Sequence, residues 1–175
     1  MFMALVCASV FATGCTRYKV REFAVVTGPV TFENWRIYVF AQVDAANPAP
    51  TNQSYQIKAL AWTAKGDYIT ANTNDFRPTA YDASLDSLRL FRVEGTNSVE
   101  LPLPPFLHGP DDRPNRLVQI FHPHGTTVEI PADVRELRAV ITLTFRHRET
   151  GRVEIRTYTL KMLKREQTKI APISA

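Results

Sequence analysis

The sequence predicts an all-β protein, an antiparallel β-sandwich of about eight strands. Stretches in which apolar and polar residues alternate recur along the chain after residue 16, and this is the period of a strand with one buried face. Glycine, proline, asparagine and aspartate separate these stretches at short intervals, as between short strands. Outside the first fifteen residues no sustained apolar repeat has the period of a helix.

The first half of the chain contains three expected strands, at residues 17–30, 34–43 and 55–64. The second is the clearest, with an apolar set at every other position: Trp35, Ile37, Val39, Ala41 and Val43. Its other face carries Tyr38 and Phe40, so both faces are apolar and a central strand is expected. Residues 45–54 and 66–84 have the composition of loops.

The second half supplies the other strands, at residues 85–93, 98–101, 116–121, 126–130, 138–146 and 153–163. One helical turn is expected at residues 131–137, and Glu149-Thr150-Gly151 predicts the turn of a hairpin. Residues 126–163 resemble the closing half of an immunoglobulin-like sandwich, and a transthyretin-like arrangement would give the same pattern. This resemblance implies a fold and names no function.

The first fifteen residues have a different character. Residues 1–12 form an apolar run interrupted only by Ser9. It is too short for a membrane-spanning helix of about 20 residues but long enough for the apolar region of a signal peptide. Ala12-Thr13-Gly14-Cys15 follows and resembles the lipobox of bacterial lipoproteins, although Ala12 stands where leucine is commoner. No Lys or Arg precedes the run, so basic residues are expected upstream of Met1. The alternative is a buried strand or helix of a cytosolic domain.

The lipoprotein resemblance implies that residues 1–14 are a cleaved signal helix and that Cys15 carries diacylglycerol and usually a palmitate-like acyl chain. Residues 15–175 would then be one lipid-anchored domain. Thr16, rather than Asp, follows the cysteine, which in this family favours the outer membrane over the inner one. The other cysteine, Cys7, would leave with the signal, so the mature domain would contain no disulfide.

Charge places some limits on partners. The net charge is +4, and 21 basic against 17 acidic residues give a mixed composition, so we expect no nucleic-acid partner. A basic tail (Lys161, Lys164, Arg165 and Lys169) fits either contact with anionic lipid headgroups or cell wall, or a solvated strand end.

The best candidate for a partner-binding loop is the proline-rich segment 102–114. It presents Leu103, Phe106 and Leu107 from a stiff backbone that loses little entropy on docking. The alternative is a loop that folds back over an open end of the sheet. We therefore expect a non-catalytic structural or binding role, with another envelope protein as partner.

Other functional classes have weaker support. Trp35 and Trp62 would suit a carbohydrate-binding platform, but both lie within strands, where a core position is expected. His122 and His124 are weak candidates for metal ligands, because Pro123 and Gly125 indicate a turn. No serine-elbow or phosphate-loop motif points to an envelope hydrolase or another enzyme, and no cofactor is expected.

Overall fold

The computed structural model describes residues 15–43, 52–65, 73–104, 106–107, 118–123 and 127–172. In these ranges the chain is nearly all β, as predicted. The described strands are β1 (Cys15–Val25), β2 (Val30–Phe32), β3 (Trp35–Gln42), β4 (Asn52–Trp62), β5 (Tyr81–Glu94), β6 (Asn97–Leu101), β7 (Phe106–Leu107), β8 (Val118–Pro123), β9 (Val128–Pro131), β10 (Glu136–His147) and β11 (Val153–Pro172). One 3-10 turn, η1 (Thr73–Asp75), stands among them.

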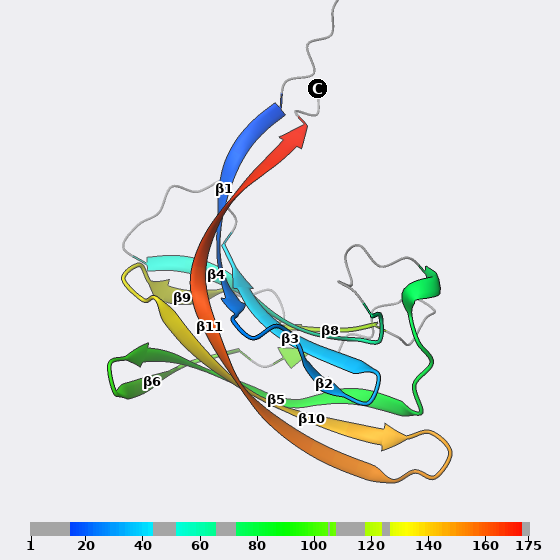
Figure 1. Cartoon of the computed structure of the whole chain (residues 1–175). Helices are drawn as coiled ribbons and strands as arrows, with labels where there is room; N and C mark the ends of the chain where they lie inside the picture. The colour runs from blue at the N-terminus through cyan, green and yellow to red at the C-terminus, as the bar shows by residue number, and fades with distance from the viewer. Residues whose placement is uncertain are drawn as a thin grey trace, which may run out of the picture.

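All strand pairs are antiparallel and form one continuous sheet, in the order β6-β5-β10-β11-β1-β3-β4-β8-β7. The short strands β2 and β9 add to the edges of β3 and β4. Figure 1 shows β5 and β10 crossing below β3 and β8, while β11 curves from the lower group to the upper one. Because both groups contribute side chains to one core, the sheet folds over itself into two layers, which confirms the predicted all-β sandwich.

Strict alternation of apolar residues places the core between these layers. In β10, Leu137, Ala139, Ile141, Leu143 and Phe145 are all fully buried, and the residues between them are more exposed. In β3 the predicted set is buried from Trp35 to Ala41. The other face of β3 and β4 carries a second apolar cluster around Trp62, so the prediction of a central strand with two apolar faces is confirmed.

Two expectations about local structure are wrong. Residues 131–137 form no helical turn: β9 ends at Pro131, and the Val134 N–H donates to the Pro131 carbonyl at 3.1 Å before β10 begins at Glu136. A single β-turn is enough to connect these two strands. The expected loop at residues 66–84 is too long, because β5 already begins at Tyr81 and pairs with β10 from there. Beyond the nine expected strands the structure adds β2 and β7, which are too short to give an alternating pattern.

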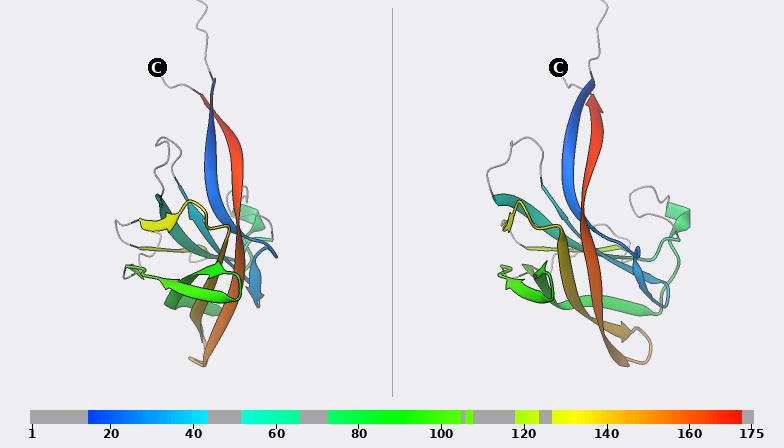
Figure 2. Two further views of the ribbon diagram at one scale, coloured as in Figure 1. Left: turned by 90° about the vertical axis from the view of Figure 1, so that its left-hand side faces the viewer. Right: turned by 60° about the vertical axis from the view of Figure 1, so that its left-hand side comes forward.

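The ends of the fold form what we call the terminal ribbon: residues 15–21 of β1 paired with residues 166–172 of β11. β11 runs to Pro172, well beyond the expected end at residue 163. It continues that far because all of β1 pairs with the last eleven residues of β11, from Met162 to Pro172. β3 pairs with β1 only at residues 22–24, and β10 pairs with β11 only up to Leu163. Both views in Figure 2 show the terminal ribbon standing clear of the rest of the sheet, which we call the body.

Among the described residues, no helix is long and apolar enough to cross a bilayer.

Candidate functional site

Cys15, the predicted lipid-bearing residue, is the first residue of β1 and pairs with Pro172 at the tip of the terminal ribbon. The predicted signal segment, residues 1–14, lies outside the described residues. All described strands therefore lie at or after the residue that the lipobox pattern designates as the new N-terminus.

The terminal ribbon is joined to the body at its base, where both strands leave the sheet at the same level. The Val43 N–H donates to the Arg21 carbonyl at 2.9 Å, and the Lys164 N–H donates to the Arg135 carbonyl at 2.9 Å. The Lys164 ammonium donates to the Ala132 carbonyl at 2.7 Å and lies over the Phe23 ring. Burial lowers the pKa of Lys164, and the nearby Arg135 and Arg21 lower it further.

In the predicted binding loop, Leu103 is half-buried and packs against the main core. Phe106 and Leu107 form β7, which pairs with β8 at Pro123 and His122, and their side chains lie outside the described part of the chain. The start of the segment thus packs against the sheet. Residues 105 and 108–117 are not described.

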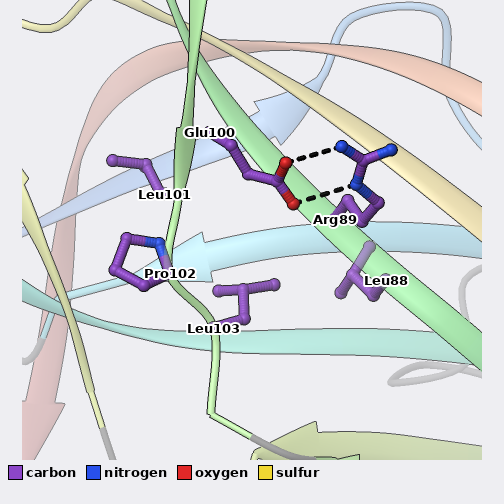
Figure 3. A pocket seen from close by; sticks show the side chains of 6 residues that line it. All are labelled: Leu88, Arg89, Glu100, Leu101, Pro102 and Leu103. Atoms are coloured by element: carbon purple, nitrogen blue, oxygen red, sulfur yellow. Dashed lines mark hydrogen bonds and ion pairs between the residues drawn. The ribbon is translucent and has the colours of Figure 1, made fainter.

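An open pocket of about 430 Å³ lies where this segment leaves β6 (Figure 3). Its apolar lining is Leu88, Leu101, Pro102 and Leu103. On one side Arg89 of β5 and Glu100 of β6 form a bidentate ion pair, with N···O distances of 2.9 and 2.6 Å. This pairing lowers the pKa of the Glu100 carboxyl, so the pair stays charged at neutral pH. The sequence pattern identified Leu103 but neither charged residue, because their contact depends on the β5–β6 register.

The predicted histidine pair is not brought together with other ligands in the described structure. His122 lies in β8, with its side chain undescribed, and His124 lies outside the described residues. The Nδ1 atom of His147 accepts the N–H groups of Glu149 and Thr150 at 3.3 Å, so this ring holds the hairpin turn. Within the described ranges no group of three or more His, Cys, Asp or Glu side chains is placed to hold a metal ion.

The aromatic residues that suited a carbohydrate platform are inside the protein. Trp35 is 0% exposed and Trp62 is 5% exposed, as expected of core residues. The Trp35 indole N–H donates to the Tyr81 carbonyl at 3.0 Å, which ties β3 to the start of β5. Neither ring can stack on a sugar without opening the core.

One cluster that sequence reasoning missed closes the end of the sandwich opposite the terminal ribbon. Glu154, only 17% exposed, binds Arg156 at 2.6 Å and Arg152 at 3.4 Å and accepts from the Tyr81 hydroxyl at 3.4 Å. Arg156 also lies over Phe32, which stacks on Phe145. Each charge has a partner inside the cluster, so its contacts are those of a structural closure.

Comparisons with protein-family models, with curated proteins and with solved structures find no match for this chain.

Proposed function

We propose that this chain is a lipoprotein of the bacterial cell envelope, anchored by lipid on Cys15 and acting by non-catalytic binding to another envelope protein. The observation that carries the proposal is the lipobox-like Ala12-Thr13-Gly14-Cys15, which stands directly before the described strands. Cleavage before Cys15 would leave every described strand intact.

The attachment has a direct test. Wild-type protein expressed in a lipoprotein-processing bacterium is expected to take up labelled palmitate, whereas Cys15→Ala is expected to take up none, because the thiol is the acylated group. Globomycin, which blocks the lipoprotein signal peptidase, should leave the wild type at its uncleaved length. Cys7→Ala is the matched control and should label like the wild type. Equal labelling of Cys15→Ala would contradict the proposal.

The pocket beside Leu103 is the proposed contact with the protein partner. It combines an apolar lining with a charged rim, and this composition is typical of the centre and edge of protein interfaces. The glycan-binding alternative has less support, since Trp35 and Trp62 are buried.

A photo-crosslinking residue at the exposed position of Pro102 should give a defined adduct in intact cells. The same residue at Ile155, which is 65% exposed and far from the pocket in the sheet, is the control and should not give that adduct. Arg89→Glu, which places two carboxylates together at the rim, should weaken the Pro102 adduct. Identical adducts from both positions would rule out the pocket as the contact.

A further inference from the structure

The terminal ribbon carries most of the net positive charge of this chain. Its outer part, residues 15–20 and 167–172, contains the basic residues Arg17, Lys19 and Lys169 and no acidic residue. These twelve residues therefore contribute +3 of the net +4, which leaves only +1 for the rest of the chain. The composition is mixed overall, but folding collects the excess at one end.

Pairing between distant parts of the sequence produces this concentration. In the β1–β11 register Arg17 lies opposite Ile170, Lys19 opposite Thr168, and Lys169 opposite Tyr18. The three basic positions thus fall within three consecutive rungs of a two-stranded ribbon. No carboxylate stands opposite any of them in this register.

The base of the ribbon is different, because its charges are used locally. Arg21 and Glu166 face each other at 3.4 Å, and Lys164 is held by the Ala132 carbonyl and the Phe23 ring. The unbalanced charge therefore increases from the body toward the tip, in the direction of Cys15.

If Cys15 carries lipid, as proposed, the basic residues at the tip lie next to the membrane surface. Along a strand each residue advances about 3.4 Å, so Arg17 lies about 7 Å from Cys15 and Lys19 about 14 Å. At a salt concentration of about 0.05 M the screening length is about 14 Å, so the three basic residues lie within it of a charged leaflet at the level of Cys15. The body, beyond a ribbon of about 20 Å, does not.

From this juxtaposition we propose that the tip of the terminal ribbon is an electrostatic docking element for anionic lipid headgroups, with Arg17, Lys19 and Lys169 as its contacts. The inference rests on the proposed attachment at Cys15 for the position of the membrane, but the charge is present whether or not Cys15 is acylated.

The test uses the full chain with Cys15→Ser, which cannot be acylated, and vesicles of phosphatidylcholine with or without phosphatidylglycerol. Each basic residue near an anionic surface is worth about fivefold in affinity, so replacing all three tip residues by Gln should weaken binding to anionic vesicles on the order of 100-fold. Binding to pure phosphatidylcholine should not change. Raising the salt from about 0.05 to about 0.5 M should reduce the difference between the two vesicles.

A matched control removes the same charge from the body. Lys65, Arg77 and Arg146 are exposed there, and their replacement by Gln should change anionic-vesicle binding less than about threefold, because they lie beyond the screening length from the tip. Thermal unfolding of both triple variants checks that each keeps the fold. Equal losses for the two triple variants would overturn the inference, since net charge rather than the ribbon would then control binding.

Three further outcomes separate lipid docking from binding to another polyanion and from the anchor at Cys15. Binding of soluble heparin as tightly as anionic vesicles would overturn the lipid assignment in favour of an anionic polymer. No preference of the Cys15→Ser protein for anionic vesicles would overturn the docking element even if wild-type Cys15 takes up palmitate. Charge-dependent vesicle binding without palmitate uptake would instead leave the docking element standing and remove the anchor.

Discussion

Tyr55 shows how a single buried residue links this core to pH. It is 1% exposed, and its ring meets Phe23 edge-on at a centroid distance of 5.3 Å. Burial raises the pKa of the Tyr55 phenol above its ordinary value of 10.0, and the nearby Arg21 only partly opposes this. The folded protein therefore holds the phenol proton at a pH where the unfolded chain has released it.

This difference predicts the sign of an alkaline stability loss. The contribution of the protonated phenol is fully present below about pH 10 and is lost as the pH rises through the raised pKa. Tyr55→Phe should change the free energy of unfolding by about 1 kcal/mol or less at pH 8, because the buried ring stays in place. As the pH rises from about 10 to 12, the free energy of unfolding of the Tyr55→Phe variant should fall less than that of the wild type. Urea unfolding followed by tryptophan fluorescence measures both, and parallel pH profiles would contradict the prediction.

At the scale of elements, the β10–β11 hairpin depends on one glycine. Gly151 has φ +69°, in the left-handed region, and its N–H donates to the His147 carbonyl at 2.9 Å. An added Cβ would meet nothing within 4 Å, so backbone conformation alone sets the cost of a substitution.

Gly151→Ala should therefore lower the free energy of unfolding by about 1–2 kcal/mol. Gly151→Asn should lower it less, because asparagine tolerates this region better. Chemical denaturation of the two variants beside the wild type gives the comparison. If the two variants lose the same free energy of unfolding, the left-handed backbone conformation is not the reason why glycine is needed at position 151.

The strands also show why part of this fold could be predicted from the sequence and part could not. Residues 138–146 alternate because β10 lies between β5 and β11 with one face on the core, so the sequence pattern is strong. The sequence of the outer part of β11 shows no such pattern. It is a strand because β1 supplies its backbone partners, and Arg21 and Glu166 stand 145 positions apart.

The candidate site divides in the same way. The lipobox-like run that ends at Cys15 is contiguous in the sequence, so Cys15 could be named as a candidate from the sequence alone. The sequence pointed to Lys169 as part of a basic tail, but not to its neighbourhood with Arg17, because these two positions come together only through β-pairing. The Arg89–Glu100 rim of the pocket likewise needs the β5–β6 register.

At the scale of the whole molecule, the body and the terminal ribbon are separable. Among the side chains that the structure describes, the main core takes Phe23 and Val25 from β1 and Leu160 and Met162 from β11, all outside the terminal ribbon. The two-stranded ribbon extends about 20 Å from Arg21 to Cys15. With lipid on Cys15, as proposed, it would hold the body at about this distance from the membrane.

A chain of residues 21–166 should accordingly remain folded. Its free energy of unfolding should lie within about 1 kcal/mol of that of residues 15–175, since no described core residue is removed. A chain ending at residue 158 is the contrast and should lose cooperative unfolding, because Leu160 and Met162 are then missing and each is worth about 2–5 kcal/mol. Urea titrations of the three chains test this, and a collapse of the 21–166 chain would show that the ribbon supports the core.

The antiparallel pairing of β1 also determines how this molecule bears mechanical load. Hydrogen bonds between antiparallel strands run perpendicular to the strand direction. A pull on Cys15 along β1, with the body held by a partner, strains the rungs from Cys15 to Val25 in shear and nearly at once. Pulling Cys15 and Pro172 apart sideways would instead break the same rungs one after another from the tip. Force along the strand therefore meets the stronger resistance, and that is the direction in which an anchored protein is dragged.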